Sequence, residues 1–388
     1  MYYLWQGPSE RIVEIAWLPF QIPYAAAFTT AHGSESARAG AIIRVTSAGG
    51  LVGLGEASPL PAFRGGTLVD ALAIIADLAP QMVGHDLGRA IELIDRLDDT
   101  APGASAVACG FDTAIHDLRA RAAGVPLARL LDPQAAAAVP VNATIGATEI
   151  AAAELAAGRA AQAGIKCVKL KVGVAGTQPA ELARIAAVRA ALAPGVRLRL
   201  DANAAWDVPQ AIDIIRAAGR YDLEFVEQPV AAGDLAGMAR VRASVGTPIA
   251  ADESIRGPEQ ARRVIAASAA DVLIVKPMMA GGLRRGREII ALAAAAGLQS
   301  LVTTTIDSGV GVAAALHLAA TLPMPSLACG LATGALLAAD LLPQPIQVRN
   351  GAIQLSDEPG LGVRIDERQA RRYVGRWQEV HKDTGRSD

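Results

Sequence analysis

The sequence predicts an α/β protein in which a parallel βα barrel follows a smaller α+β module. Short apolar runs alternate with helical segments from about residue 139 onward. Three of these runs close on an acidic residue, Asp201, Glu227 and Asp252, and these acids lie 26 and 25 positions apart. A strand, a helix and two short loops occupy about 25–40 residues, so this spacing is typical of successive βα units. Because the strands of such a barrel end at one mouth, we expect the three carboxylates to meet there.

The first module is expected over residues 1–131. Its predicted elements are strands at 12–20 and 39–57 and helices at 68–83 and 105–124. The second strand region turns back at Ala48-Gly49-Gly50, as an antiparallel hairpin does. The second helix stops at Gly124, which Val-Pro follows. Strands followed by helices indicate an α+β module.

The barrel is expected over residues 138–340. Its eight strands are predicted at 139–145, 166–172, 197–201, 223–227, 248–252, 272–276, 299–304 and 326–331. Apolar strands that alternate with helices indicate a parallel sheet, and eight of them indicate closure into a barrel. Residues 341–388 lose this alternation. Within them, 346–366 has the pattern of a hairpin and loop that return to the first module.

The composition argues against several classes of function. A net charge of −2 gives no electrostatic case for binding nucleic acid or an anionic membrane. The N-terminus lacks the basic and apolar regions of a signal peptide, and the apolar runs stop short of 18 residues. Three widely spaced cysteines predict no disulfide framework. We therefore expect a cytoplasmic protein that acts on a small molecule, and the sequence leaves open whether it is a homo-oligomer.

Lysines lie on both sides of the three acids along the chain. Lys169 and Lys171 are two positions apart on one strand and therefore project to the same face. Lys276 ends a strand four further round the barrel, so it faces them across the mouth. Three carboxylates suit a hard cation such as Mg²⁺, and a cation with paired ammoniums is expected to lower the lysine pKa. A neutral amine base near pH 7 is then available.

This combination suits removal of a proton α to a carboxylate. The obstacle in that reaction is the dianionic enolate, which a divalent ion and a nearby ammonium stabilise. Any one of the acids could simply cap the helix that follows it. That alternative is weak for three acids on consecutive strands with lysines before and after them.

The motifs KLK, DAN, EQP, DES and KP resemble those of the muconate-lactonizing-enzyme subgroup of the enolase superfamily. The resemblance extends over nearly the whole chain. It implies a modified TIM barrel, (β/α)7β, with an N-terminal α+β capping domain that the segment 341–388 completes. It also implies that Asp201, Glu227 and Asp252 bind Mg²⁺, with Mn²⁺ as an alternative metal.

The same resemblance implies roles for the remaining polar residues. Lys171 would be the base, and Lys276 the opposing acid, base or cation. Lys169 would tune Lys171 or contact the substrate carboxylate. Asn203 and Glu253 would be polar groups beside the site.

Members of this subgroup share the enolate step but differ in reaction. The segments 53–63, 139–146 and 303–311 look most like those of o-succinylbenzoate synthases, which dehydrate a cyclohexadiene hydroxy-carboxylate in menaquinone synthesis. Dipeptide epimerases usually carry Asp-x-Asp after the eighth strand, and residues 329–334 lack that pair. A dipeptide epimerase or N-acylamino acid racemase is the second expectation, muconate cycloisomerase the third, and a non-catalytic protein of the same fold the least favoured.

Six further positions are candidates for substrate contact. Asp307 follows the seventh strand and could orient a lysine or a substrate group, or cap the next helix. Thr29, Thr30 and His32 fall in the cap loop that closes over substrates in this subgroup. Arg38 and Arg64 are candidates for binding a succinyl carboxylate, with a surface location as the alternative.

Overall fold

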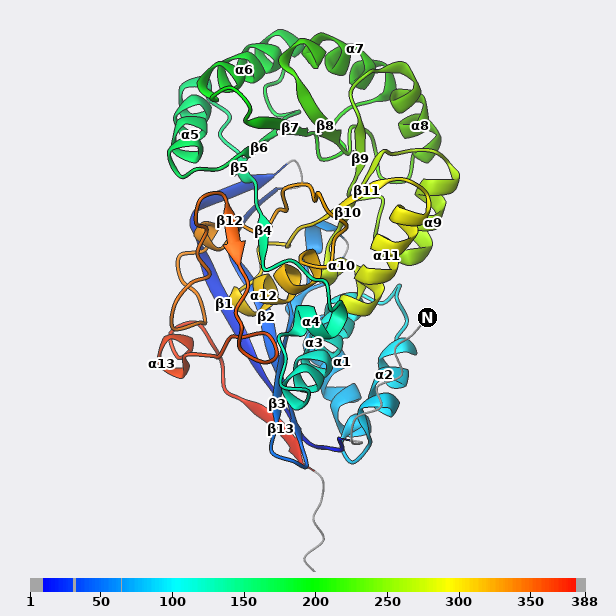
Figure 1. Cartoon of the computed structure of the whole chain (residues 1–388), viewed down its shortest axis with the longest axis vertical. Coiled ribbons are helices and arrows are strands. Elements are labelled where there is room, and N and C mark those ends of the chain that lie inside the picture. The colour runs from blue at the N-terminus through cyan, green and yellow to red at the C-terminus, as the bar shows by residue number, and fades with distance from the viewer. Residues whose placement is uncertain (1–9, 31–32, 64, 382–388) are drawn as a thin grey trace, which may run out of the picture.

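The computed structural model describes residues 10–30, 33–63 and 65–381. An antiparallel sheet with helices on one side lies below a curved parallel sheet whose helices form the outer rim (Figure 1). The first corresponds to the expected α+β module and the second to the expected barrel. The expected boundaries, 1–131, 138–340 and 341–388, stay a prediction.

The antiparallel sheet, here called the cap sheet, has the order β13-β1-β2-β3. Its strands are β1 (Ile12–Thr30), β2 (Gly33–Ser47), β3 (Val52–Ala57) and β13 (Gln378–His381). The helices beside it are α1 (Leu68–Met82), α2 (Leu87–Asp95) and α3 (Ala104–Ala122). Helix α3 approaches β3 so closely that a Cβ at Gly53 would lie 2.0 Å from the carbonyl oxygen of Ala114. Glycine in β3 is therefore a packing requirement.

The curved sheet contains seven parallel strands in chain order. They are β5 (Ala143–Ile145), β6 (Cys167–Lys171), β7 (Arg197–Asp201), β8 (Leu223–Glu227), β9 (Ile249–Ala251), β10 (Val272–Val275) and β11 (Gln299–Val302). The helices that follow them are α5 (Ile150–Gln162), α6 (Gln178–Ala191), α7 (Val208–Ala218), α8 (Leu235–Ser244), α9 (Pro258–Ala266), α11 (Leu283–Ala295) and α12 (Gly309–Ala319). A short helix, α10 (Pro277–Ala280), separates β10 from α11. The predicted (β/α)7β architecture is confirmed.

The two ends of the predicted barrel differ from expectation in detail. The region 139–145 is split into β4 (Ala138–Pro140) and β5, because Pro140 has no N–H with which to continue a ladder. The predicted strand at 326–331 is reduced to two bridges, from Cys329 to Val141 and from Gly330 to Thr303. These single-residue bridges close the gap between β5 and β11.

The C-terminal segment returns to the cap, although not as the hairpin that the sequence predicts. Asn350 and Gly351 form a tight turn with φ of 51° and 76°, across which Arg349 and Ala352 exchange backbone hydrogen bonds. The strand after this turn, β12 (Ala352–Gln354), pairs with β4 instead of extending a hairpin. Strand β13 then joins β1 in the cap sheet. Among the described residues, no helix is long and apolar enough to cross a membrane.

Candidate active site

The carboxyl ends of β6, β7 and β8 bring three of the predicted residues to one level. Lys171 pairs in register with Asp201, and Asp201 pairs with Glu227. Side chains at paired positions of a parallel sheet point to the same face, here the interior of the barrel. Asp252 directly follows β9, and Asp201, Glu227 and Asp252 are each at most 3% exposed. The predicted convergence of these carboxylates is therefore present.

Each carboxylate binds at least one of the predicted lysines. The Nζ of Lys169 lies 2.9 Å from Asp201 Oδ2 and 3.0 Å from Glu227 Oε1. The Nζ of Lys171 is 2.7 Å from the same oxygen of Asp201. The Nζ of Lys276 donates to Asp252 Oδ2 at 2.6 Å. The structure thus brings together all six residues, and their individual roles remain predictions.

Asn203 and Glu253 lie beside this group, as the sequence led us to expect. The side chain of Asn203 accepts from Lys171 Nζ at 2.8 Å and donates to Glu253 Oε1 at 2.9 Å. The backbone of Asn203 is left-handed, with φ of 45°, and its N–H bonds Asp201 Oδ1 at 3.1 Å. The other oxygen of Glu253, Oε2, is buried and has no hydrogen-bond partner. Glu253 therefore has an acceptor left for another group.

Gln228 is a site residue that the sequence reasoning missed. It is fully buried, left-handed at φ 39°, and its Oε1 accepts from the backbone N–H groups of Asp252 and Ser254. It thereby fixes the end of β9 relative to the end of β8. The Glu-Gln-Pro motif contained the signal, because a polar residue next to a strand-end acid is positioned to bond the neighbouring strand.

Burial and mutual repulsion shift the ionisation of the acids. Burial, followed by the charge of Asp201, raises the pKa of Glu227 to about 8. Burial, followed by the charge of Asp252, raises the pKa of Glu253 to about 7. Burial opposes the charge of Asp201 as well, but Lys169 and Lys171 outweigh burial and lower its pKa. The group therefore carries more negative charge than its environment readily holds.

The expectation that a bound cation lowers the lysine pKa values stays a prediction, because the shifts in this group reflect the protein's own charges alone. Burial disfavours the Lys169 ammonium, yet the charges of Asp201 and Glu227 outweigh burial and raise its pKa. The pKa of Lys276 is raised in the same way, with Asp252 as the main opposing charge. Carboxylates at hydrogen-bond distance outweigh the repulsion between ammoniums, which the sequence pattern emphasised.

The donor set fits a hard divalent cation in its chemistry. It offers carboxylate oxygens from neighbouring strand ends, the unpartnered Oε2 of Glu253 and an excess of acids over lysines. Within residues 10–30, 33–63 and 65–381, however, no group of three or more His, Cys, Asp or Glu side chains is arranged closely enough to hold a metal ion. Oxygens of these carboxylates contact the lysine ammoniums at 2.6–3.0 Å.

A cavity of about 580 Å³ opens beside this group. Asp252, Glu253 and Lys276 line one side, and Phe63 of the cap lines another. The Nζ of Lys276 lies 4.3 Å from the centre of the Phe63 ring. The cavity therefore reaches Asp252, one of the three predicted metal ligands, and Lys276, one of the predicted catalytic lysines, and the cap contributes to its wall.

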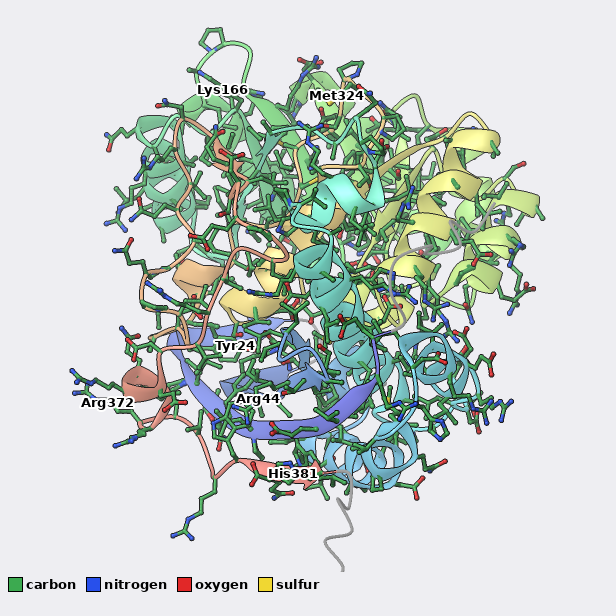
Figure 2. The ribbon with its side chains drawn as sticks, turned by 60° about the horizontal axis from the view of Figure 1, so that its bottom comes forward. Tyr24, Arg44, Lys166, Met324, Arg372 and His381 are labelled. Atoms are coloured by element: carbon green, nitrogen blue, oxygen red, sulfur yellow. The ribbon has the colours of Figure 1, made fainter. Side chains whose placement is uncertain are left out.

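Asp307 and Arg38, two of the other candidate residues, lie in the interior. Asp307 follows β11 as expected, and its Oδ1 accepts from Thr305 Oγ1 at 2.5 Å, whereas Ser308 is the residue that caps α12. Among the described residues, no lysine contacts Asp307. Arg38 is 2% exposed and its guanidinium lies 3.7 Å from Asp307, so it is neither a surface residue nor open to substrate. Lys166 is exposed and projects from the barrel rim away from the cap (Figure 2).

The cap-loop candidates cannot be placed in the same detail. Thr29 and Thr30 end β1, but their side chains lie outside the described residues. His32 and Arg64 also lie outside the described residues.

Comparison with known proteins decides the family. The model of the mandelate racemase / muconate lactonizing enzyme N-terminal domain matches residues 12–132, and that of the enolase C-terminal domain-like family matches residues 151–369. The chain belongs to the enolase superfamily. The family that the sequence motifs indicated is thus confirmed, and the chain is an enolase-superfamily enzyme.

Three relatives illustrate the range of reactions nearby. An o-succinylbenzoate synthase of Thermobifida fusca (strain YX) is 42% identical over 257 residues, which is 64% of this chain and 78% of that protein. Muconate cycloisomerase 1 of Rhodococcus opacus is 30% identical over 362 residues, covering 92% and 96% of the two chains. The solved structure of a dipeptide epimerase from Enterococcus faecalis V583, complexed with Mg and the dipeptide L-Leu-L-Tyr, superimposes with a TM-score of 0.84 at 29% identity and covers 91% and 99%. These relatives include lyases and isomerases.

Proposed function

We propose that this enzyme is a Mg²⁺-dependent o-succinylbenzoate synthase, which removes the proton α to a carboxylate and then eliminates water. The observation that carries the α-proton chemistry is the placement of Lys171 and Lys276 at the ends of β6 and β10, on either side of a row of buried carboxylates. The 42% identity to the T. fusca synthase supports the choice of dehydration. Menaquinone synthesis is the pathway that this reaction serves.

Asp201, Glu227 and Asp252 would hold the metal ion, with Glu253 and Asn203 beside them. Bound there, a divalent cation supplies positive charge that stabilises a developing enolate. It also offsets the negative charge that keeps Lys169 and Lys276 protonated, since four acids here face three lysines. These residues therefore suit a divalent cation, because they supply oxygen donors and an excess of negative charge.

In this proposal Lys171 is the base. Its neutral amine takes the α proton, and the electron pair of that C–H bond moves into the carboxylate-conjugated system. The electrons then form the ring double bond as the C–O bond of the neighbouring hydroxyl breaks. The ammonium of Lys171 lies on the same face and returns its proton to the leaving hydroxyl, so that water departs. The ammonium of Lys276 opposes the developing negative charge from the far face.

Aromatisation of the ring supplies a strong thermodynamic pull for this elimination. The protein therefore needs fewer specific contacts than an epimerase, whose reaction has no such pull. The cavity wall is in part apolar, at Ala231, Ala232, Leu235, Ile255 and Met279, and in part charged, at Arg256 and Arg263. The apolar part suits the ring of the substrate, and the arginines suit a carboxylate.

Epimerisation or racemisation is the second candidate, and the two opposed lysines favour it. One lysine on each face of an α carbon could remove and replace a proton without eliminating anything. The absence of Asp-x-Asp in residues 329–334 argues against a substrate with a free α-ammonium group. An N-acylated amino acid fits this alternative better than a dipeptide. Cycloisomerisation comes third, supported by the 30% identity to the R. opacus protein.

The deciding experiment follows the ultraviolet absorbance of the cyclohexadiene hydroxy-carboxylate with purified protein and Mg²⁺. We expect turnover that chelation and Lys171→Ala both abolish. Absence of turnover would overturn the synthase assignment. Exchange of the α proton in D₂O, measured on N-acyl amino acids and dipeptides, then distinguishes a racemase or epimerase from a protein without α-proton chemistry.

A further inference from the structure

We propose that Arg38 and Phe63 are positioning residues for Lys276. Arg38 fixes the cap segment 58–63 against the barrel, and this segment holds the Phe63 ring over the Lys276 ammonium. The inference rests on the proposed function only where it treats Lys276 as catalytic. The contacts that carry it join the cap sheet, the segment and the seventh-strand end of the barrel.

Arg38 holds the beginning of the segment. From β2, its guanidinium donates to the carbonyl oxygens of Ser58 and of Pro59, the latter at 2.6 Å. The same group donates to Thr305 Oγ1 at 3.2 Å and lies 3.7 Å from Asp307. Only arginine offers several donors in one planar fork, so one side chain ties two successive carbonyls of the cap to the barrel. Because the group is buried, these contacts are not weakened by solvent.

Ser58 links the same segment to the helix that follows Lys276. Its N–H donates to the sulfur of Met278 at 3.2 Å, and its Oγ donates to Glu56 Oε1 at 2.6 Å. Met278 lies two residues after Lys276 in the short helix α10. The segment is therefore anchored to the Lys276 region at its beginning as well as at its end.

Phe63 is the end of the segment and lies in the 3₁₀ turn Pro61–Phe63. Its ring centre is 4.3 Å from Lys276 Nζ, while Asp252 Oδ2 is 2.6 Å from the same nitrogen. A cation is attracted to the face of an aromatic ring within about 6 Å. The ammonium is thus held between a carboxylate of the barrel and a ring of the cap, at the wall of the cavity. If Asp252 turns to a metal ion, the ring remains as the contact that fixes the ammonium.

The first test separates the aromatic face of Phe63 from its bulk. Phe63→Leu keeps an apolar side chain without a ring, and we expect kcat to fall about tenfold with KM changed less than about threefold. Phe63→Trp restores an aromatic face, and we expect it to recover kcat to within about threefold of the wild-type value. Full kcat in Phe63→Leu, or equal loss in both variants, would overturn the role of the ring.

The second test asks whether Arg38 acts through Phe63. Arg38→Met is expected to lower kcat by a similar factor, and the double variant Arg38→Met/Phe63→Leu to lower it no further than about twofold beyond either single variant. The matched control is Arg44→Met, because Arg44 lies on the same strand but pairs with Glu14 and the Trp377 ring. It should leave kcat within about twofold. Multiplicative losses in the double variant would show that the two residues act independently and would overturn the linkage.

Two measurements do not depend on catalysis. Amide hydrogen exchange of a peptide spanning 58–63 should be faster in Arg38→Lys than in the wild type, and unchanged in Arg44→Met. Arg38→Lys keeps the positive charge, so it replaces Arg38→Met if that variant fails to fold. Competitive reductive methylation, read by mass spectrometry, should modify Lys276 several-fold faster in Phe63→Leu than in the wild type. Unchanged exchange and unchanged methylation would overturn the inference. If these readouts change while the wild type turns over no α-proton substrate, the positioning stands and the proposed function fails.

Discussion

Two groups of buried charges lie at the mouth of the barrel, and they are stabilised in different ways. One is the row of Asp201, Glu227, Asp252 and their lysines on β6–β10. The other is the contact between the cap and α12, where Glu56 of β3 is almost completely buried. Glu56 accepts from the N–H groups of Ser308 and Gly311 at 3.0 and 2.9 Å, and from the hydroxyls of Ser58 and Ser308.

The difference lies in the partners of the carboxylates. Glu56 is bonded in part by backbone amides at the start of a helix, which cannot move without unwinding α12. The row is bonded mainly by lysine side chains, which can turn, and it adjoins a cavity. Buried acids held by backbone therefore fix structure, and buried acids held by mobile side chains remain available for chemistry. Substitutions in the two groups should separate stability from activity.

The largest effect is expected at Lys171. Replacement by alanine removes the proposed base and should lower kcat by at least about 10³-fold, since general base catalysis contributes about 10²–10⁴. The matched control is Lys166→Ala, an exposed lysine that begins the same strand region. Steady-state kinetics gives kcat for both variants, and circular dichroism checks that both are folded. Equal rates in the two variants would contradict the assignment of Lys171.

Glu56→Ala should have the opposite character. It leaves the N–H groups of Ser308 and Gly311 without their acceptor inside the protein, at a cost of about 3 kcal/mol in the free energy of unfolding. Urea unfolding followed by circular dichroism measures this. Because Glu56 also binds Ser58 of the segment 58–63, the folded fraction should lose at most the roughly tenfold in kcat expected when that segment loosens. A variant of unchanged stability would show that the contact between cap and α12 does not depend on Glu56.

Glu227→Gln tests whether a substitution among the acids and lysines of the row changes metal binding more than stability. Because the pKa of Glu227 is raised to about 8, its carboxyl is largely neutral at pH 7 and the neutral amide replaces it with little change in charge, so the free energy of unfolding should change by less than about 1 kcal/mol. In the wild type, Mg²⁺ at 100 times its Kd should add about 2.7 kcal/mol. This stabilisation, read by thermal unfolding with and without chelator, should be lost in Glu227→Gln. A variant that retains it would exclude Glu227 as a ligand.

Asp307→Asn gives an effect that disappears at low pH. Burial, followed by the charge of Glu56, raises the pKa of Asp307 to about 6. A raised carboxyl pKa favours the protonated folded state, so its contribution to stability is present below pH 3.8 and lost as pH rises through about 6. The variant should therefore match the wild type at pH 4 and exceed it by about 3 kcal/mol at pH 8. Unfolding curves at the two pH values check this, and parallel pH profiles would contradict it.

Much of the catalytic row follows from sequence because strand register is local. Asp201 and Glu227 each end a short apolar run, and parallel pairing brings them to one level without further information. The order of strands and helices was also predictable, because the hydrophobic pattern of each element is local. Arg38 shows the limit, since its burial depends on Asp307 and Thr305, which lie about 270 residues later in the chain. The raised pKa of Lys169 likewise depends on distances that no spacing rule supplies.

The closure of the barrel has a consequence for its motion. The wall between β5 and β11 is completed at Cys329 and Gly330, whose bridges involve one residue on each side, whereas the ladder from β6 to β7 runs over five. Local opening of the wall is easiest at such a seam, because few hydrogen bonds must break together. The ladders of β9, inside the row of acids and lysines, are nearly as short, with two residue pairs to each neighbouring strand. The seam and the strand that precedes Asp252 are therefore the two parts of the wall with the fewest pairing bonds.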